Sequence, residues 1–314
     1  MSQQAVVTVR SFAADDADSV SALFRAVYGD CYVYPDVYLP SMIHRNNQQQ
    51  RWQSAVACID GEIVGHAVLW MHADSPENAE LALNVVHPSA RGMGIATLLG
   101  RHLCEQAREQ GLRCLTIKQV SSHTQSQRLA RTLGFFTTGL LLDYVASPFG
   151  NESRESVVLG CLPLQPCPIP SLSWPQACRD WIAPMERHFG TSSDIHPTSG
   201  APIVVATHEQ RIEVTLNDLH PDHLHEVAHI PKGRLVYLKL GLDQRSPAAM
   251  QQLRRAGFVY GGLMPALDRG WYGLMQRGYQ AHELDLCCPI ARALHQDSLR
   301  LADQQSASRS LEHL

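Results

Sequence analysis

Hydrophobic and polar residues in the first half of the chain change repeatedly between the two-residue period of a strand and the 3.6-residue period of a helix. The shorter period predicts strands at 7–10, 54–60, 62–71, 81–87 and 114–120, the second and third joined as a hairpin at Asp60-Gly61. The longer period predicts helices at 15–28, from Ile95 to a cap at Gly111, and at 125–133 before Gly134-Phe135. Strands and helices that alternate in this way indicate an α/β fold.

The second half of the chain repeats part of this pattern. It begins with predicted elements of the same types: a helix at 174–189, a hairpin at 203–207 and 211–216, and a helix at 221–229. A strand at 235–242, a helix that starts at Ser246-Pro247, and Gly257-Phe258 then repeat the order of 115–135. Lys239 stands at the place of Lys118. The recurrence is either a chance match of common elements or an internal repeat, and a repeat is our interpretation.

The length of the chain and a proline-rich segment near its middle divide it into two parts. Its 314 residues suit about two domains. Five prolines between Pro163 and Pro175 predict a linker that continues neither a sheet nor a helix.

Composition excludes several classes of function. A net charge of −4 with only three lysines gives no basic surface for nucleic acid. The N-terminal residues lack the charged and apolar regions of a signal peptide, and no run of about 18 apolar residues predicts a membrane span. Nine cysteines without zinc-site or disulfide spacing are typical of reduced thiols, which predicts a cytoplasmic protein.

The segment from Val85 to Ala96 carries the strongest chemical signal. It reads V-V-H-P-S-A-R-G-M-G-I-A, an apolar strand, a turn, and an Arg-x-x-Gly-x-Ala loop that opens a helix. Gly92 and Gly94 can adopt backbone angles closed to other residues, so successive N–H groups can converge on an anion at the helix N-terminus. No Lys-Ser/Thr follows the glycines, and the G-x-G-x-x-G order is absent, which excludes the commoner nucleotide motifs. The segment therefore predicts a phosphate-binding loop.

This loop resembles the pyrophosphate loop of the GCN5-related N-acetyltransferases (GNAT), with Arg91, Gly94 and Ala96 at the motif positions. The resemblance covers roughly residues 5 to 160 and implies an acyl-CoA N-acyltransferase fold with a mixed sheet. It also implies acetyl-CoA, or another acyl-CoA, as cosubstrate and no metal. We therefore expect a GNAT domain at 1–162, a Pro-rich linker at 163–175, and at 176–314 a degenerate GNAT-like domain without the pyrophosphate loop.

The resemblance also assigns residues to the coenzyme. An H-x-x-S-Q-R-L signature that starts at His123 resembles that of a bacterial subgroup of acetyltransferase-like proteins and names no substrate. In the resembled family the fourth strand is splayed from the fifth, and the acyl carbonyl rests in that gap against a strand amide. The residues expected to contact the coenzyme are Val85, Val86, His87, Arg91, Gly92, Met93, Gly94, Ile95, Ala96 and Gln127.

Glu80, at the start of the predicted fourth strand, is the candidate general base, acting directly or through a water. The alternative is a solvated carboxylate at a strand end. His87 and His66 compete for the role of base. His66 lies in an otherwise apolar strand, where a hydrogen-bonded core histidine is the better interpretation.

The general acid is where the chain departs from the resembled family. The family has Asn at the start of the helix after the fifth strand and Tyr seven residues later, but this chain has His123 and Ala130 there. His123 is a candidate acid or, in the alternative, a helix cap that touches the pantetheine arm. Tyr144 is a second candidate acid, although aromatic packing explains it as well. A thiolate leaves readily near neutral pH, so an acid helps but is not obligatory.

Acceptor recognition is expected in the segment 28–38, which holds four tyrosines: Tyr28, Tyr32, Tyr34 and Tyr38. In the resembled fold this segment covers the acceptor. Phenols can stack on the acceptor while Asp30 or Asp36 attracts a cationic amine. The alternative is a loop that packs on its own domain.

Four histidines lie close together at 220, 223, 225 and 229, and two of them share a helix face. The spacing is not that of H-E-x-x-H, and we expect no metal. The sequence as a whole predicts an acyl-CoA-dependent N-acyltransferase that transfers acetyl to an amine of a small metabolite, with the second half as a wall of the site or an internal pseudo-dimer. A homodimer is also possible. The alternatives are a non-catalytic acyl-CoA-binding sensor or interaction module and a fold without a coenzyme site.

Overall fold

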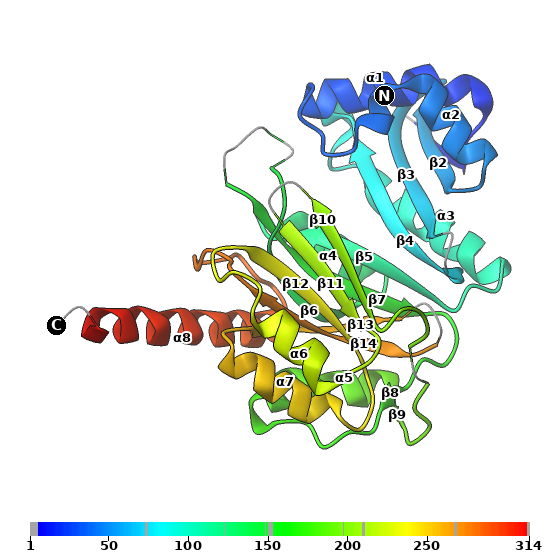
Figure 1. The fold of residues 1–314 in the computed structure, drawn as a ribbon. Coiled ribbons are helices and arrows are strands. Elements are labelled where there is room, and N and C mark those ends of the chain that lie inside the picture. The colour runs from blue at the N-terminus through cyan, green and yellow to red at the C-terminus, as the bar shows by residue number, and fades with distance from the viewer. Residues whose placement is uncertain are drawn as a thin grey trace.

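The computed structural model describes residues 6–72, 75–122, 124–147, 149, 153–196, 198–208, 211–266 and 269–312. Within these residues, twelve strands form one mixed sheet in the order β1-β2-β3-β4-β5-β7-β6-β13-β14-β12-β11-β10. The sheet runs through both halves of the chain (Figure 1). The mixed α/β fold that the sequence predicts is confirmed.

The first half contributes seven strands to the described sheet. Their bounds are β1 Val7–Ser11, β2 Trp52–Ile59, β3 Glu62–His72, β4 Ser75–Val86, β5 Cys114–Val120, β6 Phe136–Val145 and β7 Glu155–Pro163. Strands β1 to β4 are antiparallel neighbours, whereas β5 runs parallel to β4. Strand β7 lies between β5 and β6 and is antiparallel to both.

Helices cover both faces of the first-half sheet. Their bounds are α1 Ala17–Tyr28, α2 Pro40–Gln48, α3 Ile95–Glu109 and α4 Thr124–Thr132. Because successive strand residues point to opposite faces, Val56 and Val68 pack in the core that holds Phe24 of α1. Their neighbours Ala57 and Ala67 pack in the core under α3. The sheet therefore separates a face under α1 and α2 from a face under α3.

The second half adds further strands and helices. Its main strands are β10 Ile203–His208, β11 Arg211–Leu216, β12 Leu235–Gly241, β13 Val259–Pro265 and β14 Trp271–Arg277. Its helices are α5 Arg179–Phe189, α6 Pro221–Ala228, α7 Ser246–Arg255 and α8 Pro289–Glu312. All four helices contribute to one core on the same face of this half, and α8 then extends away from the body (Figure 1). Two short strands, β8 Ile169–Pro170 and β9 Thr191–Ser192, form a separate parallel pair.

The strand order of one half is mirrored in the other. In the first half the order is β4-β5-β7-β6, and in the second half it is β11-β12-β14-β13. The first two strands of each set are parallel, and the remaining pairs are antiparallel. The two sets meet at β6 and β13, so the sheet has an approximate twofold axis there. A degenerate GNAT-like second half remains a prediction, and this order is what such a repeat would produce.

Glycines allow the two halves to meet closely. Gly139 of β6 is the register partner of Gly262 of β13. A Cβ atom on Gly262 would lie 2.2 Å from the carbonyl oxygen of Thr138, and the φ angle of Gly262 is +98°. Beyond this contact the buried side chain of Gln276, on β14, binds the backbone of β6. It accepts from the amide of Leu142 at 2.8 Å and donates to the carbonyl of Leu140 at 3.0 Å. The junction is thus tightly packed and hydrogen-bonded.

The segment between the halves differs from the predicted linker. Pro163 ends β7, and Ile169–Pro170 form β8, so the prediction that this stretch carries no strand is wrong. Prolines are tolerated there because they occupy a strand end and a two-stranded edge. Cys167 and Ile169 are buried in the core of the second half. The following helix also starts later than predicted, at Arg179.

Candidate active site

The loop after β4 forms a glycine-lined turn into α3. A short 3-10 helix, Pro88–Ala90, follows His87, whose Nδ1 accepts from the amide of Ser89 at 3.3 Å. Gly92 and Gly94 have φ angles of +83° and +75°, which favour glycine, and Gly94 is the N-cap residue of α3. The hollow beside this turn has a volume of about 790 Å³. Its lining includes Val86, Arg91, Gly92, Gly94, Ile95 and Ala96.

Strands β4 and β5 separate beside this loop. Their register pairs run only from Asn78 and Cys114 to Glu80 and Thr116. Strand β4 continues to Val86, and β5 pairs with β7 along its whole length. A bulge on β4, where Leu83 has a φ angle of +51°, accompanies the separation. The gap therefore opens directly after Glu80 and leads toward the glycine turn.

Glu80 forms an ion pair at the near end of the gap. Its Oε2 atom lies 2.6 Å from Nζ of Lys118 on β5, and 14% of its side chain is exposed. Burial alone would lower the pKa of Lys118, but the charge of Glu80 and the neighbouring phenols outweigh it and raise the pKa above its usual range. Lys118 thus stays protonated, and Oε1 of Glu80 has no partner among the described residues.

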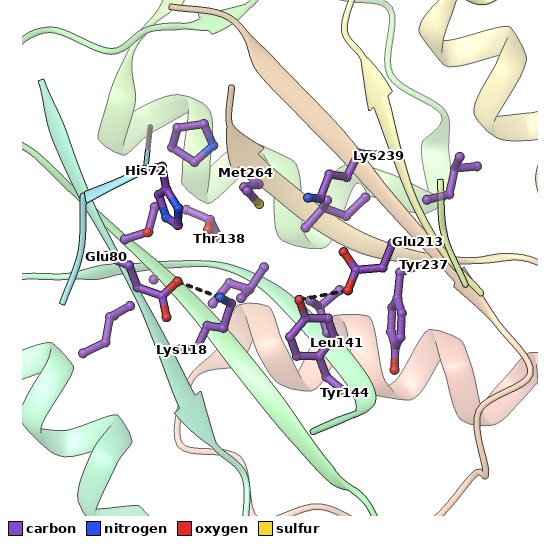
Figure 2. A pocket seen from close by; sticks show the side chains of 17 residues that line it. His72, Glu80, Lys118, Thr138, Leu141, Tyr144, Glu213, Tyr237, Lys239 and Met264 are labelled. Atoms are coloured by element: carbon purple, nitrogen blue, oxygen red, sulfur yellow. Dashed lines mark hydrogen bonds and ion pairs between the residues drawn. The ribbon is translucent and has the colours of Figure 1, made fainter. Parts of the chain in front are cut away.

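Both halves enclose a cavity of about 160 Å³ beside this ion pair (Figure 2). The first half supplies Glu80, Lys118 and Tyr144, while the second half supplies Glu213 of β11 and Lys239 of β12. Tyr144 donates a hydrogen bond from its hydroxyl to Oε1 of Glu213 at 3.4 Å. The floor is apolar, with Leu141, Leu159, Tyr237, Met264 and Leu274. The cavity is therefore charged at its walls and apolar between them.

Arg211 of β11 joins the charges at the mouth of this cavity. Its Nε lies 3.0 Å from Oε1 of Glu213, and its guanidinium lies 4.5 Å from the centre of the Tyr144 ring. It also donates to the carbonyl of Tyr144 at 2.6 Å. Burial raises the pKa of Tyr144, so the phenol keeps its proton at neutral pH.

Comparison with known proteins identifies the first half. Residues 18–135 match the model of the acetyltransferase (GNAT) family. This part of the chain is a GNAT acetyltransferase domain. The GNAT domain is an N-acetyltransferase, and its acetyl donor is acetyl-CoA. The family resemblance that the sequence suggested is confirmed.

Several solved structures are similar to this chain. The ribosomal-protein-S18-alanine N-acetyltransferase of Escherichia coli is 19% identical, with a TM-score of 0.42, over 51% of this chain and 95% of its own. An N-acetyltransferase of Staphylococcus aureus Mu50 is 21% identical, with a TM-score of 0.43, over 51% and 99%. The acetyltransferase yncA of Salmonella typhimurium, solved with acetyl-CoA, is 20% identical, with a TM-score of 0.43, over 51% and 94%.

The structure brings some of the predicted coenzyme residues of the GNAT domain together and places others elsewhere. The glycine turn and Arg91 line one hollow, together with Gln125. Gln127 lies elsewhere, because its Nε2 donates to the carbonyl of Asp285 at 2.8 Å and its Oε1 accepts from the amide of Cys287 at 2.9 Å. Both polar groups of Gln127 thus bind the second half. His123 lies outside the described residues.

The two competing histidines have different surroundings. His66 is fully buried, and burial lowers its pKa to about 4 against the opposing effects of the Leu83 backbone and Asp16. Its place in the core is as predicted, but neither ring nitrogen makes a well-formed hydrogen bond with a described residue. His87 binds Ser89 in the glycine turn and is not among the residues that line the cavity of Glu80.

The four tyrosines of the acceptor segment separate into different roles. Tyr28 lines the hollow beside the glycine turn, and Tyr34 lies with Tyr144 and Arg211 in a second opening near the cavity. Tyr32 packs on Phe24 with ring centres 5.1 Å apart. The Tyr38 hydroxyl accepts from the amide of Tyr32 at 2.9 Å, so these two rings stabilise the segment itself.

The two acidic residues of the acceptor segment bind side chains of the neighbouring helices α1 and α2. Asp30 pairs with Arg25 at 2.7 Å, and Asp36 accepts from the side chain of Asn46 at 3.1 Å. Only Tyr34 of this segment therefore reaches the opening near the cavity among the residues that the sequence selected.

The histidine cluster of the second half is occupied by local contacts. His220 caps α6 by accepting from the amide of Asp222 at 3.3 Å, and Nδ1 of His229 lies 2.7 Å from the carbonyl of His225. The described residues contain no group of three His, Cys, Asp or Glu side chains that could hold a metal. In the same part of the chain, no helix has the length and apolar character that a membrane span requires.

Sequence reasoning missed several residues of the cavity. Lys118 and Lys239 were recognised as equivalent positions, but no role followed from that equivalence. Glu213 and Arg211 gave no signal, because their place in the site depends on the register of β11 with β12. The available signal was the repeat itself, since the second-half equivalent of Glu80 can be found by aligning the two parallel strand pairs.

Proposed function

We propose that the protein transfers acetyl from acetyl-CoA to the amine of a small molecule bound in the cavity between the two halves. The observation that carries this proposal is the place of Glu80: the gap between β4 and β5 opens directly after it, and its carboxylate faces a cavity closed by the second half. The small volume of about 160 Å³ supports a small-molecule acceptor. The nine free cysteines support a reducing, cytoplasmic location.

The proposed reaction is direct transfer. The glycine turn and Arg91 hold the pyrophosphate, and the backbone at Val85 and Val86 lies beside the pantetheine arm. Oε1 of Glu80 accepts a proton from the amine, directly or through a water, and the neutral amine attacks the thioester carbonyl. The nitrogen of the tetrahedral intermediate loses its second proton to solvent, the C–S bond breaks as the carbonyl re-forms, and the sulfur of coenzyme A leaves as a thiolate.

Two residues remain candidates for protonation of the thiolate. The Tyr144 phenol retains its proton because burial raises its pKa, and this supports a role as acid. Its hydroxyl is directed to Glu213, which supports the alternative of a cavity wall. His123 remains a candidate from the sequence. Since thiols ionise near pH 8.5, the reaction can also proceed with release of the free thiolate.

The test compares Glu80→Gln with Glu62→Gln, a carboxylate on an exposed strand end. Release of free coenzyme A is measured with a panel of amines, and acetyl-CoA binding is measured by calorimetry. Glu80→Gln should lower kcat by roughly 100-fold or more, because the proton acceptor is lost, and leave acetyl-CoA affinity unchanged. Glu62→Gln should behave as the wild type. Unchanged kcat in Glu80→Gln would refute its role as base.

A further inference from the structure

The two halves place equivalent charged pairs in the same cavity. Glu80 is the register partner of Thr116, and Lys118 lies two residues beyond it on the parallel neighbour. In the second half Glu213 is the register partner of Tyr237, and Lys239 lies two residues beyond it. The approximate twofold axis of the sheet therefore gives each wall one carboxylate and one ammonium (Figure 2).

These pairs are equivalent in position but not in contacts. Lys118 binds Glu80 at 2.6 Å. Glu213 binds Arg211 at 3.0 Å and accepts from Tyr144, so its carboxylate is already neutralised. The Lys239 ammonium makes no ion pair or side-chain hydrogen bond with a described residue, and the charge of Glu213 acts on it only from a distance. The cavity is lined by these two carboxylates and two ammonium groups, and because Glu213 already pairs with Arg211 from outside the lining, Lys239 is left without an ion-pair partner.

An unpaired ammonium on a largely buried strand is costly, because burial disfavours its charged form. Burial lowers the pKa of Lys239 for this reason. Beside Lys239 on β12, Tyr237 and Leu235 pack in the apolar cluster of the same sheet face. A bound anion would give this ammonium an ion-pair partner. The cavity therefore favours a ligand that carries a negative group.

We propose that the acceptor is a small amino acid or a similar amino carboxylate, whose carboxylate binds Lys239 while its amine lies at Glu80. This inference rests on the proposed function, because it names the substrate class of the same site. One carboxylate is enough to pair with Lys239, the cavity ammonium that has no ion-pair partner, while the amine of the same molecule lies at the carboxylate of Glu80. The volume, equal to that of roughly ten water-sized spheres, also suits such a molecule.

The first experiment measures binding without chemistry. Saturation-transfer NMR without acetyl-CoA compares amino acids with their decarboxylated amines: β-alanine and L-alanine with ethylamine, and γ-aminobutyrate with propylamine. The wild type should bind the carboxylated members at least about tenfold more tightly. Lys239→Met should lose this preference, and Lys239→Arg should retain most of it because the charge remains. Lys232→Met, which removes the one lysine outside the cavity, is the matched control.

The outcomes separate this inference from the proposed function. Release of coenzyme A is measured with the same probes and variants. Carboxylate-dependent binding without turnover would support the inference and count against the proposed acetyl transfer. Turnover of plain amines and amino acids with equal kcat/KM would support the transfer and overturn the inference. A wild type that binds no carboxylated probe, or a Lys239→Met variant that keeps the preference, also overturns it.

Discussion

The described sheet contains two parallel strand pairs, β4-β5 in the first half and β11-β12 in the second. They share a geometry, but only the first pair leaves a gap between its strands. Strands β4 and β5 separate after Glu80, whereas β11 and β12 stay paired from Arg211 to Leu240. The loop after β4 has two glycines with positive φ, whereas α6 begins at Pro221, directly after its N-cap residue His220. One half can therefore admit a coenzyme arm into its sheet, and the other half presents a closed wall. The comparison teaches that a repeated fold can divide binding and enclosure between its copies.

The largest expected effect tests whether the two halves act as one body. Gly262→Ala should destabilise the protein by about 3 kcal/mol, because it combines a strained φ with a clash against Thr138. The midpoint of thermal unfolding should fall by roughly 6 °C. Gly233→Ala is the control, since its Cβ would meet open space. Equal midpoints for both variants would show that the junction contributes little to stability.

Charge reversal at the glycine turn tests the division of binding between the halves. Arg91→Glu should weaken acetyl-CoA binding by roughly 100-fold, because a pyrophosphate contact becomes a repulsion. Calorimetric titration measures the affinity. Arg101→Glu, an exposed residue further along α3, carries the same charge change as a control. An equal loss in both variants would point to general electrostatics in place of a specific contact.

The buried histidines of the two halves predict different responses to acid. The folded GNAT domain disfavours charged His66, so the unfolded chain binds more protons between pH 6.5 and about 4. Stability should therefore fall as the pH decreases through this window, by about 2 kcal/mol at pH 5, and the contribution should stop changing below pH 4. Urea unfolding at several pH values measures this, and His66→Leu should remove this part of the pH dependence.

The histidine of the second half provides the comparison. Burial also lowers the pKa of His295, against the charge of Glu283. The His295→Leu variant should remove a smaller part of the slope than His66→Leu. If both substitutions leave the acid dependence of the wild type intact, carboxylates and not histidines control it.

The smallest expected effect tests whether Glu213, unlike its first-half equivalent Glu80, has no part in the chemistry. Glu213→Gln frees Arg211 from its ion pair and increases the positive charge of the cavity. KM for an amino carboxylate should fall about threefold at nearly constant kcat, a change of less than 1 kcal/mol. Steady-state kinetics measures this change. Lys239→Met removes a positive charge, so it should change KM in the opposite direction. A large loss of kcat would instead assign Glu213 to the chemistry.

The sequence predicted features that depend on local pattern. The strand Cys114–Val120 and the glycine turn follow from residues close together in the chain. Glu80 was expected at the start of a strand from 81 but lies within β4, which begins at Ser75, and the gap beside it was expected from the family resemblance alone. The pairing of Gly139 with Gly262 and the place of Arg211 beside Tyr144 could not be predicted, because each joins segments more than 60 residues apart. Gln127 was misplaced for the same reason: its partners, Asp285 and Cys287, come from the other half.

The approximate twofold axis has a consequence for how the site can change. In a symmetric dimer of identical chains, each substitution appears on both sides of the axis, so the two walls of a shared cavity must remain alike. Here the two walls are encoded separately. Glu80 can keep an oxygen open while Glu213 is held by Arg211, and Lys118 can be paired while Lys239 is not. A molecule with two different ends can therefore be bound in one direction only, which identical walls could not enforce.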